Sequence, residues 1–569
     1  MLTRLEMLWR AAAIGGLCLG LASCTWRYQP VAAETYVGAP VPPPAAPAVI
    51  EKAPARPGEK APEKTQAPPP EPKPPEAVPS GPTPVEVDVQ EAILTAMEHN
   101  QGLVVQRLAP EITHTFEDQA AGAFDHVASG TVGNKRENFV PQVPTVQVPP
   151  GKAEAAALYS NLVFGQMALS QFLPTGTTVA LTAATNSSYL SGDPELIQSR
   201  LGLSVTQSLL RGFGTEVNLA TLRQARLDTL SSQYELRGFA ESLADQVEET
   251  YWNYALALRQ VDILKTALAL SEKQLTDANS RIDAGKLART ERAAAQAQVA
   301  LRKSDLIDGQ SKLDQTRLLL LRLLNPQGGD LWKRDIAIRQ MPAPPADKLE
   351  DVEAHVALAL RMRPDLNQAR LLIERGDLEV VKTKNGLLPQ LDLFITLGKS
   401  GYANSFGGSW RHIDDSGYDI GFGVNASYPI ENQSARAQFQ RAVLGRTQSA
   451  EALDNLAQLI QVDVRSAYLE VARAHEQIDA TAATRKYAEE TLAAEQEKFA
   501  VGRSPSLLVA TAEQNLVTAQ LAEVSAVVAE VKAFSALYRL EGSLLERRGI
   551  LAPGREPVQA SIKAIPVGR

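Results

Sequence analysis

The sequence predicts a mostly α-helical protein with membrane-type β-strands, and three observations support this fold class. Two long stretches, residues 217–283 and 433–501, contain no proline and only one glycine each. Shorter stretches alternate apolar and small polar residues, as the strands of an outer-membrane barrel do. The segments recur in the same order in two halves of the chain. This order predicts two structural repeats, each with a β-hairpin and a very long helical hairpin.

The two long stretches predict helices of ~100 Å, at 1.5 Å per residue. The return helices are expected over Leu287–Leu324 and Pro505–Glu546. Gly285 and Gly502 stand between the outgoing and returning helices, where a C-cap glycine reverses the chain.

Four stretches have the strand pattern and form two hairpins: Val179–Ser188, Leu201–Leu209, Leu391–Leu397 and Tyr418–Tyr428. A half-buried soluble hairpin shows the same alternation. Tyrosines near the strand ends favour the membrane, because aromatic residues collect at bilayer interfaces. The smallest single-chain barrels need about eight strands, so four strands per chain predict that several chains share one barrel.

The duplication is visible as a constant register. A shift of 217 residues aligns eleven identities, among them Val247 with Val464, Tyr251 with Tyr468 and Gly285 with Gly502. A shift of 263 aligns the earlier segments, so the first copy holds 263 − 217 = 46 additional residues. This insertion is expected between Phe124 and Leu173, where it adds either strands or a loop.

The N-terminal residues 1–23 are predicted to be a lipoprotein signal peptide. Residues 11–22 are apolar but too short to span a bilayer as a helix, which takes ~20 residues. Leu21–Cys24 resembles the lipoprotein cleavage box, and the resemblance implies cleavage before Cys24 and its acylation, for example with palmitate. An ordinary signal with a chance cysteine is the alternative. Thr25 favours the outer membrane by the sorting rule of that class.

Residues 24–87 are predicted to be an acylated N-terminus and an extended linker, because residues 40–84 contain 17 of the 36 prolines. The body then divides into a first repeat over 88–326, a connecting segment over 327–350, a second repeat over 351–547 and a tail over 548–569.

The composition excludes several function classes. The only cysteines are Cys18 and Cys24, so the body has no disulfide scaffold and no cysteine-based site. With 57 basic and 65 acidic residues, the net charge of −8 argues against a nucleic-acid partner. No catalytic, cofactor-binding or metal-ligating constellation is present in the sequence, so no enzyme activity, cofactor or metal is predicted.

The ordered set of these segments resembles the TolC-type outer-membrane efflux channel family over about residues 88–547. The resemblance rests on Thr206–Leu210, Val424–Ile430, Asn432–Arg436 and the two tip glycines. It implies a homotrimer with a 12-stranded β-barrel on a periplasmic α-helical barrel. It also implies an equatorial collar from residues 88–108, 327–372 and 547–569.

Family membership further implies that the periplasmic tips dock with an adaptor (membrane fusion protein) tied to an inner-membrane pump. Acidic residues often ring the closed aperture in this family, but here those positions are Leu508 and Thr511. The residues expected at the tips, for adaptor docking or gating, are Gly285, Lys286, Glu291, Gly502 and Arg503.

The predicted function is an outer-membrane channel, lipid-anchored in the outer membrane, that exports drugs or other small toxic compounds. The outlet of a type I protein secretion system is an alternative. A non-transporting coiled-coil envelope lipoprotein is an alternative of a different class, but such a spacer has no use for amphipathic strand hairpins. A periplasmic adaptor would carry one helical hairpin rather than a duplicated body.

Overall fold

The computed structural model describes residues 85–139, 158–190, 195–285, 288–327, 330–343, 349–415 and 417–558. They belong to one compact unit, residues 80–569. The predicted signal peptide, Cys24, nearly all of the proline-rich linker, Lys286 and residues 559–569 lie outside the described residues.

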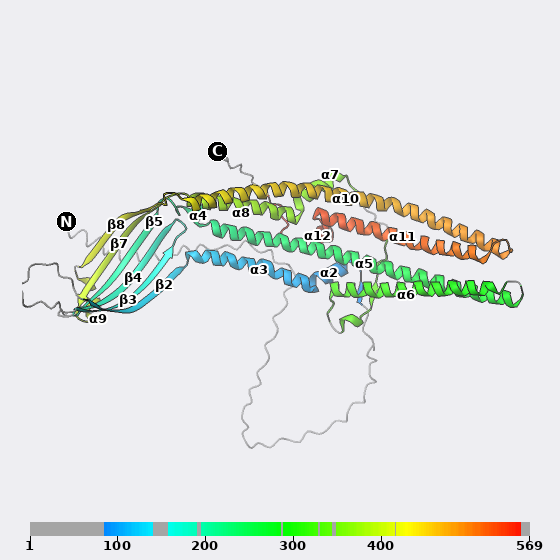
Figure 1. Ribbon diagram of the computed structural model, residues 1–569, viewed down its shortest axis with the longest axis horizontal. Helices are drawn as coiled ribbons and strands as arrows, with labels where there is room; N and C mark the ends of the chain where they lie inside the picture. The colour runs from blue at the N-terminus through cyan, green and yellow to red at the C-terminus, as the bar shows by residue number, and fades with distance from the viewer. Residues whose placement is uncertain are drawn as a thin grey trace, which may run out of the picture. The chain divides into compact units, whose positions relative to one another are not determined.

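Two long helical hairpins form nearly half of the described chain (Figure 1). The first pairs α5 (Ala220–Asp283) with α6 (Thr290–Leu324), and the second pairs α10 (Gln433–Ala500) with α11 (Ser506–Glu541). Both outgoing helices were predicted to within a few residues. The last return helix ends at Glu541 rather than Glu546, because Gly542 has a φ of 71° and stops it.

Short elements pack beside the long helices. Strand β1 (Val85–Val87) pairs in parallel with β6 (Ile336–Ile338). The short helices are α2 (Val89–His99), α3 (Gln101–Ala121), α4 (Thr215–Asn218), α7 (Val352–Met362), α8 (Pro364–Gly386), α9 (Phe406–Arg411) and α12 (Leu544–Arg547). The hydroxyl of Tyr254 on α5 donates to the Ile336 carbonyl at 3.0 Å, which joins the small sheet to the long helix.

The main core lies where these short elements meet the long helices. Tyr251 on α5, Leu320 on α6, Ile460 on α10 and Leu537 on α11 are all fully buried in this cluster. No described helix is both long and apolar enough to span a membrane.

One antiparallel sheet of six strands follows the order β2-β3-β4-β5-β7-β8. The strands are β2 (His126–Phe139), β3 (Leu158–Phe172), β4 (Thr177–Leu190), β5 (Leu196–Ser208), β7 (Gln390–Ala403) and β8 (Tyr418–Ser427). Figure 1 shows these strands leading into the long helices.

The prediction of four strands per chain is therefore wrong, because the sheet has six. The insertion between Phe124 and Leu173 supplies β2 and β3, so it adds strands and not only a loop. The alternation is weak in β2: Val127 and Val132 lie five residues apart, on opposite faces, with only Ala128, Ser129, Gly130 and Thr131 between them. Both β2 and β3 were missed, and a long ladder of backbone hydrogen bonds between them places β2 at the edge of the sheet.

Candidate functional site: the two-faced sheet and the helical hairpin tips

The six-stranded sheet has one apolar face. The strand register places one apolar residue from every strand in a single row across this face. From edge to edge the row is Ala128, Leu169, Leu181, Leu203, Leu397 and Ile420. Other side chains of this face are also uncovered: Val132 is 86% exposed, Met167 72% and Phe422 81%. An apolar face of this extent marks a surface that contacts a membrane or another protein.

The opposite face of the sheet carries small and polar residues. The corresponding row across all six strands is Ser129, Ala168, Thr182, Gly202, Gly398 and Asp419. Arg200 on β5 pairs with Asp419 on β8, with Nη2 and Oδ2 2.5 Å apart. The pair reaches across β7 at Gly398, where a Cβ would collide with the Asp419 carboxylate. Glycine there leaves room for a charged pair on the polar face.

The two hairpin tips have the geometry that their glycines predict. Gly285 has a φ of 67° and Gly502 a φ of 73°, a left-handed conformation that glycine adopts without strain. At either position, no atom lies within 4 Å of an added Cβ. The tips therefore require the glycine backbone conformation but no close packing. Arg503 is exposed beside Gly502.

The structure brings the two tips together within one chain. The Ser506 hydroxyl at the start of α11 donates to the Glu291 carboxylate at the start of α6. The Arg281 guanidinium lies 5.4 Å from the centre of the Phe499 ring. Glu291, one of the residues predicted at the tips, thus joins the two hairpins.

A second polar contact lies further from the tips. The Gln274 side-chain amide on α5 donates to the buried carboxylate of Glu513 on α11. Burial raises the pKa of Glu513 above its usual range. The sequence analysis missed this residue, although a carboxylate between the apolar residues Ala512 and Leu516 on α11 is a signal that could have marked it.

Arg503 and its neighbours show how the second tip is closed. The Arg503 amide donates to the Lys498 carbonyl at 2.8 Å. The Ser504 hydroxyl and the Lys498 ammonium donate to Glu495 at 2.7 Å and 2.6 Å, and these donors hold the Glu495 pKa below its usual value. The turn is therefore fixed by its own residues, and the Arg503 side chain points into solvent.

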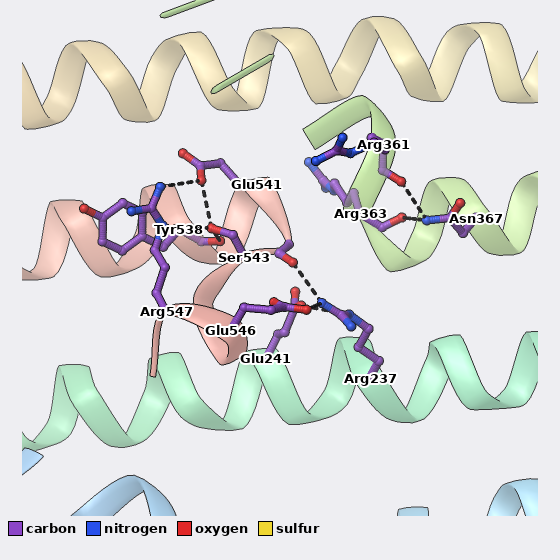
Figure 2. Close-up of polar contacts among 11 residues, drawn as sticks. Arg237, Glu241, Arg361, Arg363, Asn367, Tyr538, Glu541, Ser543, Glu546 and Arg547 are labelled. Carbon is purple, nitrogen blue, oxygen red and sulfur yellow. Dashed lines mark hydrogen bonds and ion pairs between the residues drawn. The ribbon is translucent and has the colours of Figure 1, made fainter. Parts of the chain in front are cut away.

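A buried polar cluster joins α12 to α5 (Figure 2). Arg237 is 1% exposed; its Nε lies 3.2 Å from Glu241 and its Nη2 2.5 Å from Glu546. The same guanidinium donates to the Gly542 carbonyl at 3.1 Å, at the break that ends α11. Burial raises the pKa of Glu241 to about 8, although Arg237 acts in the opposite direction. This cluster holds the end of the second repeat against the first.

Asn367 holds a neighbouring loop in place. Its side-chain amide donates to the carbonyls of Arg361 and Arg363 at 3.2 Å and 3.0 Å, as Figure 2 shows. Its carbonyl oxygen accepts from the Val558 amide at 3.0 Å. Within the described residues, no group of three or more His, Cys, Asp or Glu side chains is placed to hold a metal ion.

A two-faced antiparallel sheet that continues into long helical hairpins is the fold seen in solved outer membrane channels. Residues 356–543 match the family model described as outer membrane efflux protein. The resemblance to TolC-type outer-membrane efflux channels that the sequence predicted is thereby confirmed.

Solved structures agree with this assignment. The chain is similar to the CmeC outer membrane channel of Campylobacter jejuni, with 14% identity and a TM-score of 0.59 over 80% of this chain and 86% of that chain. It is also similar to the open-state MtrE channel of Neisseria gonorrhoeae, with 17% identity and a TM-score of 0.56 over 80% and 89%.

The outer membrane protein VceC of Vibrio cholerae is 15% identical, with a TM-score of 0.58 over 80% of this chain and 96% of that chain. At these identities the likeness establishes the fold. No curated protein gives a significant sequence match. The proteins that the chain resembles are channels and not enzymes.

Proposed function

We propose that this protein is the outer-membrane channel of a tripartite export system that conducts drugs or other small toxic compounds from the periplasm to the outside. The observation that carries the proposal is the two-faced sheet. Its uncovered apolar row suits contact with lipid, and its polar face, with the Arg200–Asp419 pair, suits contact with water. Strands of a transmembrane barrel alternate in this way.

The strands have the length that a membrane requires. The shortest strand of the sheet, β8, has 10 residues and the longest, β3, has 15. A tilted strand spans the hydrocarbon core with about 9–11 residues. Six strands with two free edges still fall short of a closed barrel, and an open edge is not tolerated in lipid. Several copies of the chain therefore complete the barrel, and the family's trimer is the proposed assembly.

The helical hairpins extend the conduit into the periplasm in this proposal. The tips at Gly285 and Gly502 lie about 100 Å along the helices from the strands, at 1.5 Å per residue. They are the part that reaches a periplasmic adaptor bound to an inner-membrane pump. The acyl group proposed at Cys24 adds a lipid anchor in the outer membrane.

The contacts between the tips supply a gate. Ser506 with Glu291, Arg281 with Phe499 and Gln274 with Glu513 join the two hairpins near their free ends. A helical end that opens must separate these partners, whereas backbone ladders hold the sheet end together. The gate therefore belongs at the tips, where Arg503 is exposed for an adaptor to contact.

Export and crosslinking in cells test this function. A strain that lacks the channel should accumulate a fluorescent efflux substrate, and the wild-type gene should restore export. Gly502→Val and Arg503→Glu should impair export without removing the protein from the outer membrane. A cysteine at Arg503 should crosslink to the adaptor, which is readily detected because the chain has no cysteine beyond Cys24.

The matched control is a cysteine at Glu476, which is exposed on α10 about 40 Å from the tip. It should give no adaptor adduct. Normal export by both tip variants, together with no crosslink at position 503, would contradict a docking role for the tips. If the strain without the channel contained no more of the substrate than the wild type, the export function itself would be contradicted.

A further inference from the structure

We propose that each copy of the chain contributes six strands to the channel wall, not four, and that β2 of one copy pairs with β8 of the next. Three copies of a six-stranded sheet would then close a barrel of 3 × 6 = 18 strands. This inference rests on the proposed function, since it concerns the wall of the same channel.

The inserted hairpin has the dimensions of a wall segment. Strand β2 has 14 residues and β3 has 15, as long as the 14 residues of β4 and β7. Strand β3 pairs with β4 along thirteen residues, from Ser160 with Leu190 to Phe172 with Thr178. Both inserted strands are therefore long enough to cross the hydrocarbon core.

The inserted hairpin also shares the two faces of the sheet. Leu169 of β3 lies opposite Leu181 of β4, and Ala128 of β2 continues that apolar row. On the other face, Ser129 of β2 continues the row of small polar residues. A one-residue shift in register would place each set on the wrong face. Towards the far end of β2 the apolar face carries Asn134 and Arg136 instead. The register therefore matches β2 and β3 to the two faces of the other four strands over the part nearest the helices, from Ala128 to Val132 on β2.

The turn between β3 and β4 is fixed to the rest of the chain. The Asn218 side-chain amide donates to the carbonyls of Pro174 and Gly212 at 3.0 Å and 2.8 Å. The Ser208 amide donates to the Gly176 carbonyl at 3.0 Å. Gly176 has a φ of 86°, and a Cβ there would collide with the Gly212 carbonyl oxygen. The hairpin is thus bonded to the β5–α4 connection and is not a loose appendage.

The two edges of the sheet are complementary in direction. The sheet is antiparallel throughout and has an even number of strands, so β2 and β8 run in opposite directions. Strand β2 leaves the helical end after α3, and β8 returns to it before α10. Two such edges from neighbouring copies can form an antiparallel pair. A long open edge is otherwise a site of uncontrolled pairing.

The helices that adjoin these two edges also carry uncovered apolar residues. On α3 these are Val105, Leu108, Ile112 and Phe116, each at least 51% exposed and spaced three or four residues apart. On α10 they are Leu444, Leu459 and Val462, each at least 53% exposed. Because uncovered apolar residues adjoin both free edges of the sheet, the partner that covers them in this proposal is a second copy of this chain. The seam would then continue from β2 and β8 onto α3 and α10.

The inserted hairpin changes the size of the channel. Barrel diameter grows roughly in proportion to strand number, so 18 strands give a barrel about 1.5 times as wide as 12 strands, and barrels of 16–18 strands enclose an aqueous channel. The outer end of the conduit would then be about twice as large in cross-section.

Disulfide mapping tests which strand lies next to β8 of the neighbouring copy. Cysteines replace Ser129 or Thr131 on β2, in pairwise combination with Asn425→Cys or Ser427→Cys on β8; all four positions are on the polar face. The control set places the first cysteine on β4 instead, as Ala180→Cys or Thr182→Cys, which would lie at the edge if β2 and β3 were outside the wall.

We expect at least one β2–β8 combination to give covalent dimers and trimers under oxidising conditions, whereas the β4–β8 combinations remain monomeric. Electron microscopy of the detergent-purified channel should resolve 18 strands. Adducts from β4–β8, a 12-stranded wall, or the absence of β2–β8 adducts in a channel that still exports would overturn the six-strand wall and leave the proposed function standing. Absence of the protein from the outer membrane would overturn both.

Discussion

The outgoing helices α5 and α10 correspond in sequence, yet they occupy different environments. Helix α5 packs against α2, α3, α6, α8, α11 and α12, whereas α10 packs against α7, α8 and α11. Val247 and its counterpart Val464 are both fully buried. Leu459 and Val462 of α10, however, are uncovered. Corresponding helices of the two repeats therefore differ in their surroundings: α5 is central in the first half, whereas α10 keeps apolar residues uncovered in the second.

Corresponding polar residues of α5 and α10 also differ in burial. Arg237 and Glu241 are buried on α5, and the shift of 217 places Asp454 and Gln458 at the corresponding points of α10. Asp454 is exposed. Substitutions at these corresponding positions can therefore show which stabilising contacts occur in both repeats and which occur in only one.

The largest effect is expected from Arg237→Ala. The substitution leaves the buried carboxyl of Glu241 and the carboxylate of Glu546 without their guanidinium donor. Breaking a buried ion pair costs about 3–5 kcal/mol of folding free energy. Asp454→Ala should change stability by less than about 0.5 kcal/mol, as exposed sites do. Urea unfolding in detergent, followed by helix circular dichroism, measures both, and equal effects would refute the contrast.

Glu241→Gln places the second-half residue type into the first half and should alter the pH dependence of stability. The folded-state pKa of Glu241 is raised from 4.5 to about 8, so the folded protein keeps a proton that the unfolded chain releases near pH 4.5. Stability from this group is full below pH 4.5 and falls as the pH rises towards 8. The variant should lose this component. Parallel unfolding curves of wild type and variant at pH 5 and pH 8 test it, and an unchanged pH slope would contradict the assignment.

Tyr251→Phe should be more costly than Tyr468→Phe, although the two tyrosines correspond in the repeat. The Tyr251 hydroxyl donates to the Gln340 carbonyl at 3.2 Å and is buried, while Tyr468 is only half-buried. Loss of a typical buried hydrogen bond costs about 1 kcal/mol. Thermal unfolding should show a larger drop for Tyr251→Phe. The reverse order would show that the hydrogen bond from Tyr251 to Gln340 does not contribute to stability.

The smallest difference is expected at the tips, where the halves remain alike. Gly285→Ala and Gly502→Ala each force a residue with a Cβ into the left-handed region, at a cost of about 1–2 kcal/mol confined to the turn. Neither added Cβ meets a neighbouring atom. Hydrogen exchange at the two turns should increase by similar factors, with the global unfolding midpoint nearly unchanged. A large global loss from either variant would reveal packing at that tip.

Local sequence signals were sufficient for the long helices and for four of the strands. The long runs without proline located α5 and α10, and Gly285 and Gly502 located their ends, because backbone conformation depends on the residue itself. Strands β4, β5, β7 and β8 were found from alternation, which survives wherever one face is apolar and the other polar.

The remaining features depend on contacts between distant residues. Strand β2 has little alternation, and its place in the sheet is set by backbone pairing with β3. The tip contacts of Glu291 with Ser506 and Arg281 with Phe499 join residues more than 200 positions apart. Such pairs depend on how the two long helical hairpins are aligned against each other, and no single stretch of sequence specifies this alignment.

The direction of the strands sets a rule for how a chain of this kind can enlarge. Helices α3 and α10 flank the sheet at the same end, so the chain must leave and return to that end. A single added strand would leave the following helix at the opposite end of the sheet and make the two edge strands run in the same direction. An added pair restores both the direction and the compatibility of the edges. A sheet between these two helices can therefore gain strands only one hairpin at a time, and in the proposed ring of three copies each added hairpin contributes six strands.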